Sequence, residues 1–409
     1  MITYVILVSI ELLICITYSY RNKLICITND FELFGTGFMP SGLGRQPLRS
    51  DFKKIATQKD VARRAGVSQS TASLVLNGNA TMLRIADETR ERVELAAREL
   101  RYHPNAVARG LLRGRMNTIG VVMASADLDF ESPAGSYCGS VITGILDVAV
   151  KRGQFVVLFP GGVWSDVRNS LPSYCDGRSD GLLLIAPPEN SDITAMLLET
   201  HLPLVLIGDQ SDDPRVTSVD VDNAAATQSL MTYLLELGHR RIAALRWSGF
   251  PYSVMLRLQG YREALEEYGI MEKDQQIIAA DWSEDWYHSF LQPIRDLMSK
   301  PATERPTALF CFNDIIAINA IRILQEMGLR VPEDVSVVGF DDTREASTLQ
   351  PPLTTVRQAP RLIGKRAAEL LLSQIQDDAP PGSKEFIGTE LVIRGSAGPP
   401  PEEKPKTAD

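Results

Sequence analysis

From Thr118 onward, short apolar runs alternate with longer segments of helical periodicity, and the alternation begins a second time near residue 241. Continuous apolar strands between helices are typical of parallel sheets covered on both faces, so the pattern predicts two doubly wound α/β lobes. Ligands of such folds bind at the carboxyl ends of the strands. The strands are expected in TIGVVM, QFVVLF, GLLLIA, PLVLIG, RIAAL, ALFCF and VSVVGF, and the helices at 137–151, 192–200, 223–237, 255–268 and 314–327.

A different pattern precedes the lobes. Thr57 and Asp60 have the spacing of a helix N-cap, and Gly66 marks the end of that helix. Ser68 can cap a second helix over Gln69–Leu76. Two short helices joined by a tight glycine turn predict a helix-turn-helix, although a small helical hairpin within a larger core has the same signals.

A third helix is expected from Asp87 to Leu100, which makes the head all-α. Its apolar residues Val93, Leu95, Ala96 and Leu100 are available to close a small core.

Charge separates the head from the rest of the chain. Residues 53–115 contain thirteen Lys or Arg and six Asp or Glu, a net charge of +7, whereas the whole chain carries −9 and the remainder therefore −16. A basic segment on an acidic body indicates an anionic partner for that segment, and the exposed short polar side chains of the second helix suit DNA.

The segment PNAVARGLLRGR, residues 104–115, connects the head to the first strand. Its apolar spacing is helical, but Pro104 begins it and Gly110 lies in its middle. Gly costs about 1 kcal/mol relative to Ala inside a helix, so an isolated helix here is marginal. We expect the segment to become helical on its partner.

Residues 1–20 form a largely apolar run interrupted by Glu11, and residues 30–52 lack periodicity. The first fifty residues are interpreted as a disordered or spurious extension, with a membrane anchor as the alternative.

The composition gives no support to an enzyme. The five cysteines include no CxxC, which fits a reducing cytoplasm, and neither a nucleophile elbow nor a glycine-rich phosphate loop is present. No metal-ligand spacing or catalytic residue is found among the four histidines, His103, His201, His239 and His288. His239 is interpreted as a structural loop residue.

The motifs together resemble the LacI family of bacterial transcriptional regulators. The matching blocks span about Ile55 to Pro400 in the expected order and include DVARRAGVSQSTASLVLNG, YHPNAVARGL, DGLLLIAP, LLELGHRRIA, RLQGYREAL, FNDIIAINA, GLRVPEDVSVVGFDDT and PPLTTVRQ. The resemblance implies a homodimer that binds a near-palindromic double-stranded DNA operator. It also implies a two-lobed, periplasmic-binding-protein-like body that takes a small effector, with no cofactor and no metal.

The resemblance sets the domain boundaries. We expect an extension at 1–52, a DNA-binding head at 53–102, a hinge helix and linker at 103–117, a body at 118–397 and a disordered tail at 398–409. Within the body, the first lobe is expected at about 118–221 and 356–378, and the second at about 222–355 and 384–397.

The family's DNA contacts map onto the head and the hinge. Leucine at position 74 replaces a frequent arginine and cannot make a bidentate contact to guanine. In the hinge, Leu111 matches the wedge that enters the minor groove between base pairs. The expected contacts are Gln69, Ser70, Thr71, Ser73 and Leu74 in the major groove, Thr57 and Asn77 on the backbone, and Asn105, Ala108 and Leu111 in the minor groove. Helix cap and helix end are the alternative roles of Thr57 and Asn77.

The effector residues follow from the same mapping. The guanidinium of Arg257 suits paired hydroxyl or carboxylate acceptors. A sugar is the expected effector, with purines or nucleosides as the alternative. The effector-binding set is Arg257, Asp341, Asn313, Trp282 and Asp209. Asp314 is expected to be a helix cap instead, and Asp342 a hydrogen-bonding loop residue.

Ile318 and Leu349 match positions at the subunit interface, with ordinary core and loop apolar residues as the alternative. The absence of leucine heptads from the end of the chain favours a dimer. The resulting prediction is a cytoplasmic, ligand-controlled DNA-binding regulator, most simply a repressor. An extracytoplasmic sugar-binding receptor with the same body is the alternative.

Overall fold

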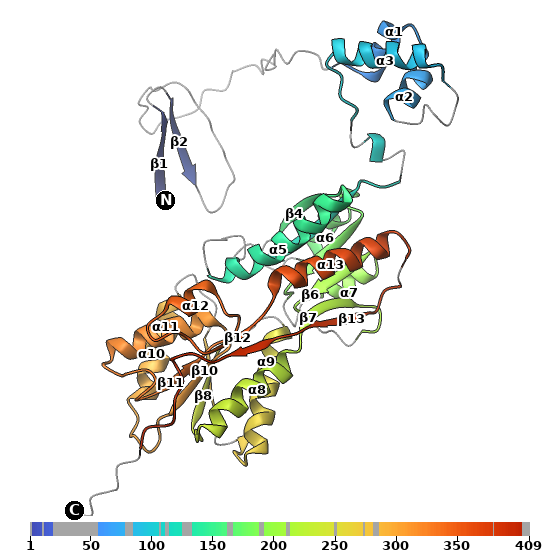
Figure 1. Cartoon of the computed structure of the whole chain (residues 1–409). Helices are drawn as coiled ribbons and strands as arrows, with labels where there is room; N and C mark the ends of the chain where they lie inside the picture. The colour runs from blue at the N-terminus through green and yellow to red at the C-terminus, as the bar shows by residue number, and fades with distance from the viewer. Residues whose placement is uncertain are drawn as a thin grey trace, which may run out of the picture.

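The protein is described by a computed structural model (Figure 1). The residues described are 2–9, 12–18, 56–77, 85–105, 108–110, 114–124, 133–161, 167–187, 192–209, 213–248, 252–272, 275–280, 286–378 and 380–402.

The head contains α1 (Gln58–Ala65), α2 (Gln69–Leu76) and α3 (Asp87–Glu99), close to the predicted bounds. Thr57 forms a capping box with Asp60, and Gly66 ends α1 with a φ of +66°, which a side chain would disfavour. Ser68 caps α2 by accepting from the Thr71 N–H. These local signals explain why the helix-turn-helix could be predicted.

The core of the head differs from the prediction at one residue. Val93, Ala96 and Ala97 are buried, whereas Leu95 is 53% exposed. At 100° per residue, position 95 points away from a face defined by positions 93, 96 and 97. Leu95 was therefore wrongly assigned to the core.

In the hinge, residues 108–110 are helical. Asn105 precedes them and accepts a hydrogen bond at Oδ1 from the Ala108 N–H, 3.3 Å away. The wedge residue Leu111 lies outside the described residues.

The first lobe is built on a six-stranded sheet in the order β13-β7-β6-β5-β3-β4, and all of its strand pairs are parallel. Two apolar clusters cover its two faces, one with α5 and α13 and the other with α6 and α7. The strands are β3 (Thr118–Ala124), β4 (Phe155–Gly161), β5 (Gly181–Ile185), β6 (Leu204–Ile207), β7 (Thr217–Val221) and β13 (Lys384–Ile387). The helices are α5 (Pro133–Arg152), α6 (Val167–Tyr174), α7 (Ile193–Leu198) and α13 (Pro360–Ile375).

The second lobe has a parallel sheet in the order β11-β10-β8-β9. The cluster around α5 and α13 continues into α8 and α9 of this lobe, while α10 and α11 pack on the other face. The strands are β8 (Ile242–Trp247), β9 (Gln276–Ala280), β10 (Ala308–Cys311) and β11 (Ser336–Val338). The helices are α8 (Asn223–Glu236), α9 (Tyr252–Glu267), α10 (Trp286–Met298), α11 (Asp314–Glu326) and α12 (Arg344–Thr348).

The C-terminal part corrects two predicted boundaries. Residues 384–387 were expected in the second lobe, but β13 pairs with β7 in the first sheet, because α13 returns the chain to that sheet's open edge. The chain then pairs β14 (Glu390–Val392) with β12 (Thr355–Arg357) between the lobes. The tail does not begin at Gly398, because its carbonyl oxygen accepts from His239 Nε2 at 2.8 Å.

The first residues contain two antiparallel strands, β1 (Ile2–Ser9) and β2 (Leu12–Tyr18). Among the described residues, no helix combines the length and the apolar character needed to cross a membrane.

Candidate functional site

The first turn of α2 presents the polar face expected to read DNA. Gln69 and Ser70 are exposed. Thr71 is half-buried and its hydroxyl lies 2.8 Å from the Ser68 hydroxyl, so one of its hydrogen bonds is already made within the head. Gln69 and Ser70 are therefore the most accessible of the predicted groove contacts on this turn.

The two predicted DNA-backbone contacts, Thr57 and Asn77, lie at helix ends. Asn77 ends α2, and its Nδ2 donates to Ser73 Oγ at 3.1 Å. Thr57 likewise serves as the N-cap of α1, so both residues have the structural roles considered as alternatives to DNA contact. Leu74 is half-buried and offers no polar group to a base edge.

The predicted effector residue Arg257 is on α9 and is 8% exposed. Its Nε donates to Asn223 Oδ1 at 2.9 Å, and its Nη1 donates to the carbonyl oxygen of Phe312. The guanidinium carbon lies 3.7 Å from the centre of the Phe340 ring. The planar group is therefore held in one orientation by contacts on its edge and its face.

Asp341 faces this guanidinium after β11. Its Oδ1 lies 3.7 Å from Arg257 Nη2 and accepts from Gln358 Nε2 at 2.6 Å. Burial raises the pKa of Asp341 more than Arg257 lowers it. The φ angles of Asp341 and Asp342 are +121° and +56°, and two successive non-glycine residues in this region store backbone strain, which is typical of functional sites.

Next to these residues, Asn313 rather than Asp314 caps α11. Asn313 is extended and caps α11, accepting from the Ile316 N–H at 2.9 Å, because an N-cap must precede the first helical residue. Asp314 is already helical and fully buried, and it accepts from the Thr355 hydroxyl at 2.6 Å. The prediction that Asp314 is the cap was wrong.

Asp342 forms the hydrogen bonds expected of a loop residue. It accepts from Arg357 Nε at 2.7 Å and from Arg394 Nη2 at 2.6 Å, which ties the loop after β11 to β12 and to the segment after β14.

Two residues of this cluster were not predicted individually. Asp220, at the carboxyl end of β7, is buried and accepts from Asn223 Nδ2 at 2.9 Å. Burial raises the pKa of the Tyr137 phenol on α5 well above its usual value, and the nearby charges of Asp220 and Asp341 raise it further. In the sequence, Asp220 lies just before the helix expected at 223–237 and Tyr137 begins the helix expected at 137–151, and this position is the signal that could have found them.

The remaining effector candidates are only partly placed. Asp209 follows β6 and is buried, and Trp282 lies outside the described residues. The ends of β7, β10 and β11 nevertheless bring Asp220, Asn313 and Asp341 to the same side of two sheets around Arg257, as expected for ligand binding in parallel sheets.

Comparison with known proteins identifies the family. A model described as "Bacterial regulatory proteins, lacI family" matches residues 57–105, and one described as "Periplasmic binding protein-like domain" matches residues 231–397. The "HTH-type transcriptional repressor PurR" of Vibrio atlanticus (strain LGP32) is 35% identical over 326 residues, which cover 79% of this chain and 93% of that protein. The chain belongs to the LacI family.

Solved structures agree with this assignment. The complex of the transcriptional regulator CelR with cellobiose is 31% identical, with a TM-score of 0.62, and covers 84% of this chain and all of that one. The lac repressor dimer bound to operator and the anti-inducer ONPF is 30% identical, with a TM-score of 0.68 and the same coverage. This LacI-family chain is thus a DNA-binding transcriptional regulator with a ligand-binding body.

In this LacI-family chain, the predicted interface residues lie on the second lobe. Ile318 on α11 is 8% exposed in the single chain, and Leu349 after α12 is half-buried against the lobe's core. Within the described part of the chain, no group of three or more His, Cys, Asp or Glu is placed to hold a metal ion.

Proposed function

We propose that the protein is a homodimeric repressor whose operator affinity is set by a sugar bound around Arg257. The observation that carries the proposal is the fixed guanidinium of Arg257 between Asn223 and the strained Asp341. A hydroxyl both donates and accepts hydrogen bonds, so a polyhydroxylated ligand can bind arginine and carboxylate groups at once. The likeness to CelR in complex with cellobiose supports this ligand class.

The head and hinge supply the operator contacts in this proposal. Gln69 and Ser70 read base edges, with Thr71, Ser73 and Leu74 beside them in the major groove. Thr57 and Asn77 contact the backbone, and Asn105, Ala108 and Leu111 enter the minor groove. The exposed side chains of Gln69 and Ser70 support their placement, since these have the fewest competing contacts within the head.

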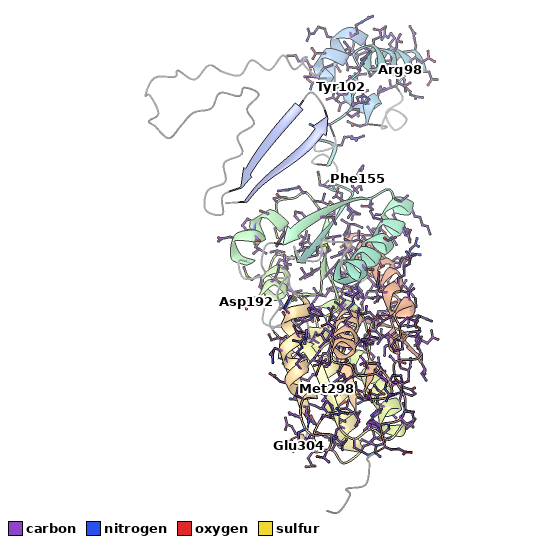
Figure 2. The ribbon with its side chains drawn as sticks, turned by 90° about the vertical axis from the view of Figure 1, so that its left-hand side faces the viewer. Arg98, Tyr102, Phe155, Asp192, Met298 and Glu304 are labelled. Carbon is purple, nitrogen blue, oxygen red and sulfur yellow. The ribbon has the colours of Figure 1, made fainter. Side chains whose placement is uncertain are left out.

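Dimerisation uses both lobes. In the first lobe, β4 is an edge strand, and it exposes Phe155 by 69% and Leu158 by 38%. The adjoining α5 exposes Val150 by 78% and Leu146 by 43%. A cluster of exposed apolar residues favours burial against a partner, and we assign it, together with Ile318 and Leu349, to the contact between two copies. Figure 2 shows Phe155 at the end of this lobe nearest the head.

Selection of duplex DNA from a random pool by the full chain tests the function. We expect a near-palindromic site whose affinity falls steeply with salt, and a shift of that affinity when sugars are added. Enrichment of no sequence would contradict the regulatory function. A response to nucleosides and to none of the sugars would contradict the ligand class alone.

A further inference from the structure

One side chain of the first lobe holds the point where the hinge enters the body. Asp180, the residue before β5, accepts from the Met116 N–H at 2.6 Å through Oδ1 and from the Thr118 N–H at 3.1 Å through Oδ2. Its own N–H donates to the Thr118 carbonyl at 2.8 Å. Asp180 is thus bonded to both ends of the segment 116–118.

The end of the hinge is connected to the same segment. The Arg115 N–H donates to the Gly110 carbonyl at 3.1 Å, and Gly114 has a φ of +66°. Gly110 is buried, and a Cβ at this position would lie 2.2 Å from Met116 Sδ. Met116 therefore packs on the hinge with its side chain and bonds to Asp180 with its N–H.

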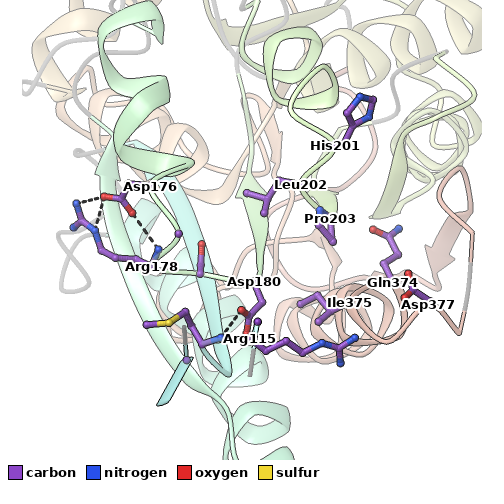
Figure 3. A pocket seen from close by; sticks show the side chains of 15 residues that line it. Arg115, Asp176, Arg178, Asp180, His201, Leu202, Pro203, Gln374, Ile375 and Asp377 are labelled. Carbon is purple, nitrogen blue, oxygen red and sulfur yellow. Dashed lines mark hydrogen bonds and ion pairs between the residues drawn. The ribbon is translucent and has the colours of Figure 1, made fainter. Parts of the chain in front are cut away.

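A pocket of about 810 Å³ opens beside this joint. Arg115 and Asp180 line it together with His201 and Gln374 of the lobe (Figure 3). Because the pocket is open space beside Arg115, the bonds from Met116 and Thr118 to Asp180 connect the end of the hinge to the lobe where packing on that side is missing.

We propose that Asp180 is the positioning residue that makes the hinge follow the first lobe, an inference that rests on the proposed function. Hydrogen bonds from N–H groups to a carboxylate are stronger than those to a neutral acceptor, and here two of them converge on one side chain. Asp180 directly precedes β5, and β5 pairs with β3. The first lobe and residues 116–118 at the end of the hinge therefore rotate together. Through this joint, the arrangement of the lobes sets the separation of the two hinges in the dimer.

Asp180→Asn tests the joint in the full-length protein, because the amide keeps the size of the side chain and loses one acceptor. Asp176→Asn is the matched control. Asp176 lines the same pocket and bonds to Arg178 rather than to the hinge. Hydrogen exchange at Met116 and Thr118 is expected to become about tenfold faster in Asp180→Asn and to stay unchanged in Asp176→Asn.

DNA binding gives the second measurement. Asp180→Asn is expected to lower affinity for a duplex selected by the wild-type chain about tenfold, while affinity for random duplex stays unchanged. A purely structural role would lower both DNA affinities together.

Wild-type exchange at Met116 and Thr118 in Asp180→Asn, or wild-type affinity for the selected duplex, would overturn the proposal. If Asp180→Asn does not fold, Asp180→Glu provides the comparison, since it keeps both acceptors but displaces them, and faster exchange at the same two amides is again expected. If the wild-type chain selects no duplex, the proposed function fails, whereas the exchange measurement still decides whether Asp180 holds the hinge.

Discussion

Arg257 on α9, the residue expected to bind the effector, donates a hydrogen bond of 2.9 Å from Nε to Oδ1 of Asn223, the first residue of α8. Nη2, on the same edge of the guanidinium as Nε, lies 3.7 Å from Asp341 Oδ1, beyond hydrogen-bond distance. A ligand hydroxyl can therefore bridge Nη2 and the carboxylate from one side without breaking the bond to Asn223.

Arg257→Lys is expected to abolish the response to ligand while the ligand-free chain still binds its operator. Lysine keeps the charge but cannot reproduce the planar fork, so ligand affinity should fall at least about tenfold. Fluorescence anisotropy with labelled operator, with and without ligand, measures both properties. An unchanged ligand response in Arg257→Lys would refute the assignment of Arg257.

The buried carboxyl of Asp314 should make stability depend on pH. Burial, and then the nearby charge of Asp341, raises its pKa above the ordinary value of 3.8, so the folded protein binds this proton more tightly than the unfolded chain. This contribution to the free energy of unfolding is fully present below the ordinary pKa and is lost as pH rises through the raised pKa. The folded protein should accordingly lose stability from mildly acidic toward mildly alkaline pH.

Asp314→Asn is expected to flatten that dependence, because the amide imitates the neutral carboxyl and can still bond to Thr355 and to the Thr343 N–H. Urea denaturation at several pH values between about 5 and 8 measures the slope. Asp334→Asn is the control, because Arg330 lowers the pKa of that half-buried group and its contribution is lost only at more acidic pH. Equal slopes in wild type and Asp314→Asn would exclude Asp314 as the source.

The features that the sequence predicted well are those with local causes. The capping box at Thr57 and the glycine turn at Gly66 act within a few residues, so α1 and α2 appeared with their predicted ends. The seven apolar runs also marked real strands, namely β3, β4, β5, β6, β8, β10 and β11. Pairing of β13 with β7 could not be predicted in this way, because it joins segments more than 160 residues apart.

The cluster around Arg257 shows the same limit. Asp220 and Tyr137 come from β7 and α5, and only the folded chain brings their charges and hydrogen bonds near Asp341. Asn313 and Asp314 both suit a helix start by residue type, and the backbone conformation decides which one caps α11. Gly110 was expected only to weaken a helix, whereas its contact with Met116 also depends on the fold.

Gly364→Ala should destabilise the first lobe. A Cβ at Gly364 would lie 2.0 Å from the Val141 carbonyl oxygen, so α13 and α5 could not approach as closely. Overpacking of this kind typically costs about 1–3 kcal/mol. Gly388→Ala is the control, since nothing lies within 4 Å of a Cβ there. Urea denaturation compares the two variants, and equal midpoints would show that the helix contact adapts without cost.

Val150→Asp should weaken the dimer through the first lobe. Val150 is 78% exposed on α5. An aspartate at this position would lose its hydration when the interface forms, which costs free energy of association. Analytical ultracentrifugation should show dissociation at concentrations where the wild type is dimeric, with operator affinity falling at low concentration and recovering at high concentration. Met271→Asp, at an apolar residue of the second lobe that is 61% exposed, should leave the dimer intact. Equal dissociation of the two variants would show that added charge, rather than this surface, governs association.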